Sequence, residues 1–256
     1  MRTDPLEISV DVVRAEASRF LHPLLLVHGL WTGGWIWRDF SAYLAHRGWE
    51  AWIPSFLSGG APPDVERRRS VLADVCRELS APPVVVTHDA GLALADLLGP
   101  DLRPPAVVAI APLALRLPVV WNRPRWWRAA LGGDRIAPPA GGADSFASGL
   151  LEADVRRLRT DSGELFRRVC LGGREPGDPP RAGLVVSAGE DPVARLAECR
   201  RLAARRSWDL EIQEGSGHFP MLGVQATRLA DRVHRWLVRT LGADLLAWAE
   251  DEDPDE

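Results

Sequence analysis

Residues 82–91, Pro-Pro-Val-Val-Val-Thr-His-Asp-Ala-Gly, decide how this chain folds. The apolar run at 84–87 predicts a buried strand, and residues 92–98 predict the helix that follows it. A sharp turn centred on Asp89 joins the two. This strand-turn-helix context is that of a nucleophile elbow, whose usual pattern is Gly-x-Ser-x-Gly. Here the pattern is Thr-His-Asp-Ala-Gly, so a carboxylate stands where a hydroxyl is expected.

Strand and helix patterns alternate along the rest of the chain. Apolar runs predict strands at 24–27, 50–53, 84–87, 106–110, 184–187 and 210–213, and helical patterns occur at 37–47, 63–78, 92–98, 192–205 and 225–240. Residues 5–17 have room for one or two edge strands. The alternation predicts an α/β fold with a mostly parallel central sheet and helices on both faces.

Residues 114–181 interrupt this alternation. The interval contains Gly/Pro-rich stretches at 132–142 and 172–183, with a helical pattern over 145–168 between them. It predicts a helical cap inserted between two strands. The core of the fold then comprises residues 1–113 and 182–245.

The composition is that of an ordinary soluble globular protein. The 256 residues are 46% hydrophobic and 26% charged, with a net charge of −4. All 31 basic residues are arginines that alternate with acids on helical segments, which indicates a solvated surface and not a nucleic-acid site. No stretch is apolar enough over about 20 residues to span a membrane. The acidic residues 246–256 predict a disordered tail.

The cysteines give no sign of a zinc site or a disulfide framework. Cys76, Cys170 and Cys199 form no Cys-x-x-Cys pair and have no histidines at ligand spacing. Together with an acidic start that does not resemble a signal peptide, this predicts a cytoplasmic protein without a metal or other cofactor. The sequence gives no indication of oligomeric state.

Polar residues follow three further predicted strands. Asp191 comes after the strand at 184–187, and His218 comes after the strand at 210–213. The turn that begins at His28 after the first strand could present backbone N–H groups. Because the carboxyl ends of parallel strands meet at one edge of the sheet, we expect these groups to lie near Asp89.

These motifs resemble those of the α/β-hydrolase family, over about residues 20–240. The matching stretches, in chain order, are VHGLWTGGW (27–35), VVVTHDAG (84–91), GEDPV (189–193) and EGSGHFPM (214–221). The resemblance implies that Asp89 is the nucleophile, Asp191 the acid and His218 the base, with the backbone N–H groups of Leu30 and Ala90 forming an oxyanion hole. It also places the cap after the sixth strand of the family fold.

A carboxylate at the elbow limits the possible reactions. An aspartate needs no base to remove a proton before it attacks. Attack on an ester carbonyl would give a reactive anhydride, whereas attack on a carbon bearing a halide, or on an epoxide, gives a stable ester. His218, oriented by Asp191, would then activate a water against that ester. The resemblance thus implies a dehalogenase-like or epoxide-hydrolase-like hydrolase of a small apolar substrate.

The chain departs from each of these subfamilies at the groups that assist the leaving group. Haloalkane dehalogenases generally have Trp after the nucleophile and often Asn after the His-Gly pair, and fluoroacetate dehalogenases have Arg after the nucleophile; this chain has Ala90 and Leu30 at these positions. Epoxide hydrolases use cap tyrosines, but the single tyrosine, Tyr43, lies outside the cap interval. We predict a substrate pocket lined instead by indole and amide side chains, namely Trp31, Trp121, Asn122, Trp126 and Trp127.

Two alternative functions stay open. The stretches 28–37 and 146–154 resemble the carboxylesterase and methylesterase branch, which carries serine at the elbow. Descent from that branch is compatible with a hydrolase or lyase of altered chemistry. It is equally compatible with a catalytically inactive protein that binds small molecules.

Overall fold

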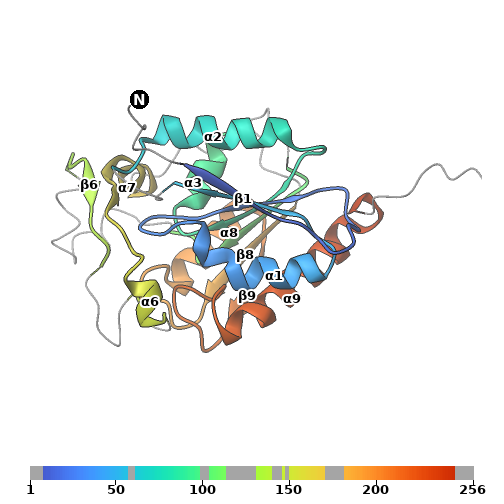
Figure 1. The fold of residues 1–256 in the computed structure, drawn as a ribbon. Helices are drawn as coiled ribbons and strands as arrows, with labels where there is room; N and C mark the ends of the chain where they lie inside the picture. The colour runs from blue at the N-terminus through green and yellow to red at the C-terminus, as the bar shows by residue number, and fades with distance from the viewer. Residues whose placement is uncertain are drawn as a thin grey trace, which may run out of the picture.

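The computed structural model describes residues 8–56, 61–98, 104–113, 131–139, 146–147, 150–170 and 182–245. Its centre is a twisted sheet (Figure 1). The strands of this sheet are β1 (Ser9–Val13), β2 (Leu24–Val27), β3 (Ala51–Ser55), β4 (Val84–His88), β5 (Ala106–Ile110), β8 (Ala182–Ala188) and β9 (Asp209–Gln213).

The sheet is parallel except at one edge. Its strand order is β1-β3-β2-β4-β5-β8-β9, and only β1 runs antiparallel to its neighbour, β3. The strands predicted at 24–27 and 106–110 have those bounds, and the other four agree within two residues at each end. The carboxyl ends of β2, β4, β5, β8 and β9 therefore lie along one edge, as expected from the alternation.

Helices cover both faces of the sheet. Their bounds are α1 (Arg38–His46), α2 (Val65–Glu78), α3 (Gly91–Asp96), α8 (Leu196–Arg206) and α9 (Val224–Leu241), with one-turn 3-10 helices at Gly34–Trp37 and Gly242–Leu245. α1 packs against α9 on one side of the sheet, and α2 and α3 lie on the other (Figure 1). The predicted α/β architecture is confirmed.

One predicted helix begins later than expected. The helix predicted from residue 192 starts at Leu196. The chain before it folds around Asp191, whose carboxylate accepts hydrogen bonds from the N–H groups of Val193 and Ala194. This local bonding fixes Asp191 before the helix begins.

The three central strands are buried along their whole length. All residues of β2, β4 and β5 are buried, with Leu24 through Val27 fully inaccessible to solvent. A parallel sheet covered on both faces requires such continuous apolar runs. The core therefore forms a rigid support for the loops at the carboxyl edge.

We call the described residues 131–139, 146–147 and 150–170 the cap segment. It holds the short pair β6 (Arg135–Ile136) and β7 (Asp161–Ser162), followed directly by α7 (Gly163–Cys170), and the one-turn helix α6 (Glu152–Val155). The helical pattern over 145–168 is thus broken at the pairing of β7 with β6. The division into core and cap at 114 and 181 stays a prediction, because both boundaries lie outside the described residues.

Close backbone packing explains this break. A Cβ on Gly163 would overlap the carbonyl oxygen of Gly133, so only glycine allows these two segments of the backbone to approach each other. The side chain of Asp161 turns inward, where it is fully buried and paired with Arg68 of α2. A tertiary contact therefore overrides the helical pattern.

Candidate active site

The elbow places Asp89 at the tip of a strained turn between β4 and α3. Its φ of 55° is in the left-handed region, which few residues other than glycine occupy. The turn after β2 comes very close to the elbow. A Cβ on Gly91 would lie 2.5 Å from the carbonyl oxygen of Val27, and a Cβ on Gly29 would overlap the Cβ of Asp89. The two glycines are what permit the sharp turn.

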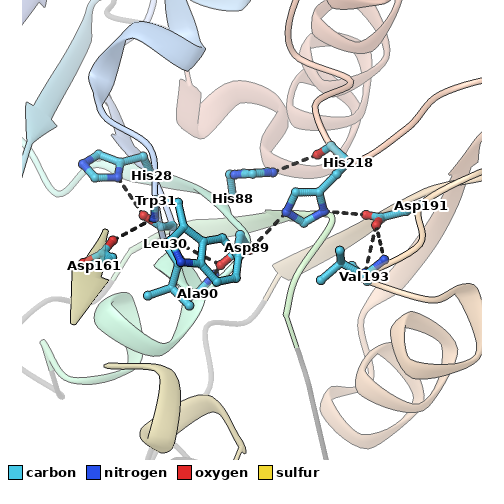
Figure 2. A network of polar contacts seen from close by, with 12 residues as sticks. His28, Leu30, Trp31, His88, Asp89, Ala90, Asp161, Asp191, Val193 and His218 are labelled. Atoms are coloured by element: carbon cyan, nitrogen blue, oxygen red, sulfur yellow. Dashed lines mark hydrogen bonds and ion pairs between the residues drawn. The ribbon is translucent and has the colours of Figure 1, made fainter. Parts of the chain in front are cut away.

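The two carboxylate oxygens of Asp89 have different partners. Oδ1 accepts hydrogen bonds from the backbone N–H of Leu30, at 3.3 Å, and from that of Ala90. Oδ2 lies 3.0 Å from Nε2 of His218 (Figure 2). The carboxylate is thereby fixed with one oxygen in the pair of N–H groups and the other on the histidine.

His218 lies between two carboxylates. Its Nδ1 is 2.7 Å from Oδ2 of Asp191, opposite its contact with Asp89. Burial alone would lower the pKa of His218, but attraction and hydrogen bonding to Asp191, followed by those to Asp89, raise it to about 10. Burial raises the pKa of Asp191, yet His218 and two backbone N–H groups bring it below its usual value. The resting site therefore contains an imidazolium that donates to both carboxylates.

Two further buried histidines are neutral. Burial, with His218 nearby, lowers the pKa of His88 to about 3, and burial with Arg68 does the same to His28. His88 Nε2 donates to the carbonyl oxygen of His218 at 2.9 Å, and His28 Nε2 accepts from the N–H of Phe56 at 3.0 Å. These histidines hold the loops in place and are not available as acids at neutral pH.

Trp31 belongs to the wall of the site, but its indole is already bonded. The side chain is fully buried, and Nε1 donates to the carbonyl oxygen of Ile136 at 3.1 Å. This N–H is therefore not free to bind a ligand. The other predicted pocket residues lie outside the described part of the chain; they are Trp121, Asn122, Trp126 and Trp127.

Phe146 of the cap segment covers the site. Its ring centroid is 4.8 Å from that of His218, 5.1 Å from that of Trp31 and 5.0 Å from that of Phe219. Asp89 is 1% exposed and His218 is not exposed at all. The carboxylate and imidazole thus lie beneath an aromatic layer, in a site that is closed to solvent.

A cavity of about 650 Å³ occurs elsewhere, against α1 and α9. It is lined by Arg19, Phe20, Tyr43, His46, Arg47, His234 and Val238. Its polar side chains bond elsewhere: Tyr43 donates to Asp231, Arg47 donates to Tyr43, and His234 accepts from Trp49. The candidate active site is therefore the closed aromatic site that holds Asp89 and His218, and not this cavity.

The structure brings together every predicted catalytic residue and adds others that the sequence reading missed. Asp89, Asp191, His218, Leu30 and Ala90 form one connected network. Asp161, Arg68 and Phe146 were not predicted. Asp161 and Arg68 carry no local motif, and the stretch 146–154 gave no sign that Phe146 would reach His218, because all three act through contacts with residues far away in the chain.

The described residues contain neither a cluster that could hold a metal ion nor a membrane-spanning helix. Within them, no three His, Cys, Asp or Glu side chains come together in a way that could hold a metal ion. No helix in this part of the chain is both long and apolar enough to cross a membrane.

Burial raises the pKa of the Cys170 thiol to about 12 and that of Cys199 to about 11, so neither is a thiolate at neutral pH.

Comparisons with known proteins agree with this architecture. Residues 24–232 match the family model described as the alpha/beta hydrolase family. No curated protein sequence matches the chain.

Three solved structures illustrate the likeness. The monoacylglycerol lipase of Paleococcus ferrophilus is 16% identical, with 92% of this chain and 100% of that chain covered and a TM-score of 0.70. A soluble variant of the monoglyceride lipase of Saccharomyces cerevisiae is 12% identical, with 94% of each chain covered and a TM-score of 0.69. An epoxide hydrolase of Vigna radiata is 16% identical, with 93% and 97% covered and a TM-score of 0.64. At such identities the likeness shows the fold alone.

Proposed function

Because this chain belongs to the alpha/beta hydrolase family, we propose that it hydrolyses a small apolar substrate through an ester formed on Asp89. The reaction class is that of a dehalogenase or an epoxide hydrolase. The aromatic rings of Phe146, Trp31 and Phe219 around His218 suit an apolar substrate.

One observation carries the proposal: Oδ1 of Asp89 already accepts hydrogen bonds from the backbone N–H groups of Leu30 and Ala90. In hydrolases with a serine nucleophile such a pair of donors stabilises the oxyanion formed on the substrate. Here the donors hold an oxygen of the enzyme's own carboxylate. The oxyanion that they are placed to stabilise is therefore one that forms on the side chain of Asp89.

In the first step Oδ2, the other carboxylate oxygen of Asp89, is the nucleophile. A lone pair on Oδ2 forms a bond to a saturated carbon, and the bond from that carbon to its leaving group breaks. The electron pair of that bond leaves with the halide or stays on the ring oxygen of an epoxide. The product is a neutral ester on Asp89, and no base is required.

The second step needs His218 as a base. The proton that His218 carries at rest leaves first, to the ring oxygen of an opened epoxide or, after loss of a halide, to solvent. Neutral His218 then takes a proton from water, and the hydroxide adds to the ester carbon of Asp89, with the negative charge on Oδ1 facing Leu30 and Ala90. The intermediate then expels the alcohol oxygen, which takes the proton from His218. Loss of the remaining proton from the new carboxyl group restores the carboxylate.

The charge on His218 links the two steps. In the resting site its pKa of about 10 keeps it protonated and unable to act as a base. Ester formation removes the negative charge of Asp89, which is one of the two that hold this proton. We expect Asp89→Asn, which mimics the uncharged ester, to lower the pKa of His218, measured by NMR of the imidazole signals. An unchanged pKa would contradict this link.

The direct test is to trap the ester. His218→Gln should be alkylated by haloalkanes or epoxides and should retain the adduct, because the second step lacks its base. Intact-protein mass spectrometry and peptide mapping would locate the added mass on Asp89. The double variant Asp89→Asn with His218→Gln is the control and should acquire none. No adduct with any haloalkane, epoxide or activated ester would contradict the proposal.

Isotope labelling tests the second step in the unmodified enzyme. If water attacks the ester carbon of Asp89, turnover in ¹⁸O-labelled water places ¹⁸O in the Asp89 carboxylate. If water attacks the substrate directly, the label appears only in the product. The location of the label therefore separates the two routes.

Ala90 and Leu30 stand where the resembled dehalogenases carry side-chain donors for the leaving group, so such donors have to come from elsewhere in the chain. We propose that the indole N–H groups of Trp126 and Trp127 fill this role. Replacing each by Phe should slow ester formation without slowing ester hydrolysis. Unchanged turnover in both variants would remove these residues from the mechanism.

A second candidate function is a small-molecule binding protein without turnover. It is favoured by the closure of the site beneath Phe146. In this case ligands should raise the melting temperature while no adduct or product forms, and Phe146→Ala should change ligand affinity without producing turnover. Leu151→Ala, at an exposed leucine of the cap segment, is the matched control.

A further inference from the structure

Every backbone polar group of Trp31, and its indole N–H, is bonded to the cap segment. The N–H donates to Oδ2 of Asp161 at 2.8 Å, and the carbonyl oxygen accepts from the N–H of Arg159 at 3.0 Å. The indole N–H donates to the carbonyl oxygen of Ile136. Trp31 thus joins the first turn of the core to a segment more than 100 residues away in the sequence.

The backbone of Trp31 needs such support. Its φ is 63°, in the left-handed region that is unfavourable for a large side chain. Its preceding neighbour is Leu30, whose N–H reaches Oδ1 of Asp89 at 3.3 Å. Only the two backbone torsions of Leu30 separate this N–H from the amide of Trp31, so holding the backbone of Trp31 restricts the direction of the Leu30 N–H.

A single ladder pair supplies two of the three contacts. Ile136 of β6 pairs directly with Asp161 of β7. The carbonyl oxygen of one and the carboxylate of the other both bind Trp31 (Figure 2 shows Asp161 beside this turn). The short ladder therefore holds both the backbone N–H and the indole N–H of Trp31 by hydrogen bonds.

Asp161 is itself held in one orientation. It is fully buried, and its Oδ1 accepts from Nη2 of Arg68 and from the N–H of Ser162. Arg68 is fully buried too and donates through Nε to the carbonyl oxygen of Pro63 at 3.2 Å. Both oxygens of the buried carboxylate are thus used, and its charge is compensated.

We propose that Asp161 is a positioning residue that acts through Trp31 to hold the Leu30 N–H on Oδ1 of Asp89, with Arg68 fixing Asp161. Asp161 touches neither the substrate nor the reacting atoms. Its predicted effect on catalysis rests on the proposed function: loss of Asp161 weakens one oxyanion donor, which slows hydrolysis of the ester more than its formation.

Amide hydrogen exchange tests the positioning without any substrate. In Asp161→Asn the amides of Leu30 and Trp31 should exchange about tenfold faster or more, because a charged acceptor is replaced by a neutral one. The control is Asp154→Asn, which weakens another ion pair between the cap segment and the core, that with Arg38, and does not touch Trp31. Unchanged exchange at Leu30 and Trp31 in folded Asp161→Asn would overturn the proposal.

A second variant covers the case in which Asp161→Asn does not fold. Arg68→Met with Asp161→Leu removes both buried charges, a change that proteins often accept without loss of stability. The Trp31 N–H again loses its acceptor, so the same faster exchange is expected. Exchange as slow as in the wild type would count against the proposal.

The kinetic consequence is measured separately with 1-bromobutane and 1,2-epoxybutane as probes. In rapid-quench mass spectrometry Asp161→Asn should form the Asp89 ester at a rate close to that of the wild type and hydrolyse it about tenfold more slowly or worse. Equal slowing of both steps contradicts a positioning role at the oxyanion donors. If neither probe alkylates the wild type, the proposed function fails with these substrate classes while the exchange result still decides the role of Asp161.

Discussion

The sheet core and the cap segment are stabilised by different forces. Strands β2, β4 and β5 are mostly apolar, wholly buried and paired along their length. The cap segment has a two-residue ladder and short helices, and it is tied to the core by the ion pairs Arg38–Asp154 and Arg68–Asp161. The core is thus specified by burial and periodicity, whereas the cap segment depends on a few particular contacts.

This difference matters for the site, which lies between the two regions. Loops of the core supply Asp89, Asp191 and His218, and the cap segment supplies Asp161 and Phe146. The core fixes the reacting groups, and the cap segment covers them and supports one hydrogen-bond donor. Four predictions test this comparison.

The largest effect is expected at the buried ion pair. Arg68→Met leaves Asp161 charged and unpaired in the interior and should lower the free energy of unfolding by about 3 to 5 kcal/mol. Arg38→Met breaks a pair whose arginine side chain is 39% exposed, so about 1 kcal/mol is expected. Urea unfolding measures both. Equal losses would show that burial does not distinguish the two contacts.

A core leucine should come next. Leu26 is fully buried in β2, and Leu26→Ala should cost about 2 to 5 kcal/mol through lost burial and the cavity left behind. Leu151→Ala in the cap segment, where the side chain is 68% exposed, should change stability by less than about 0.5 kcal/mol. A large loss at Leu151 would indicate that the cap segment buries more apolar surface than its exposure implies.

Between pH 4 and 8 the pH dependence of stability should come from the histidines, which all belong to the core, because residues 114–181 contain no histidine. His28 and His88 have a pKa of about 3, well below the ordinary histidine value near 6.5. The free energy of unfolding that they contribute is therefore lost as the pH falls from about 6.5. His218 has a raised pKa of about 10, so its contribution is complete below about 6.5 and is lost as the pH rises to 10.

These three groups together place the greatest stability near pH 6.5, with slopes of about 1.4 kcal/mol per pH unit for each histidine. Urea unfolding between pH 4 and 8 measures the acid limb and the beginning of the alkaline limb, below the pH at which unfolded cysteine thiols ionise. His88→Gln should reduce by about half the slope of the free energy of unfolding below pH 6.5, because His28 still contributes, and should leave the slope above pH 6.5 unchanged. An unchanged acid limb would mean that His88 is not held neutral by burial.

The smallest effect is expected at a surface pair of the cap segment. Glu152 and Arg156 form an ion pair with both side chains more than 70% exposed. Glu152→Gln should therefore change the free energy of unfolding by less than about 0.5 kcal/mol. A loss comparable to that of Arg38→Met would contradict the view that a pair of two exposed side chains stabilises the cap segment less than a pair with one buried partner.

Much of the core could be predicted because its signals are local. Continuous apolar runs mark β2, β4 and β5, and the pattern around Asp89 marks the elbow. The predicted positions of Asp191 and His218 after β8 and β9 follow from parallel strand order alone. The helix expected from residue 192 starts late because the bonds to the Asp191 carboxylate are not visible in periodicity.

The cap segment could not be predicted in the same way. A ladder of two residues per strand has no period to detect, and the break at β7 depends on the approach of Gly163 to Gly133. The burial of Asp161 with Arg68 joins residues 93 positions apart. Such contacts arise only when the folded core places α2 and the first turn beside the cap segment.

The α/β fold and the position of the carboxylate at the elbow follow from the sequence through short-range periodicity and turn pattern, and the resemblance of its motifs to those of α/β-hydrolases indicated Asp191 and His218 as partners of Asp89. The surroundings of that carboxylate follow only from the folded structure: one oxygen of Asp89 accepts from two backbone N–H groups and the other lies on His218, with Phe146 above and Asp161 bonded to the turn at Trp31. Hydrogen-bond direction and burial are set by chain segments that meet in space, and no local stretch of sequence encodes them.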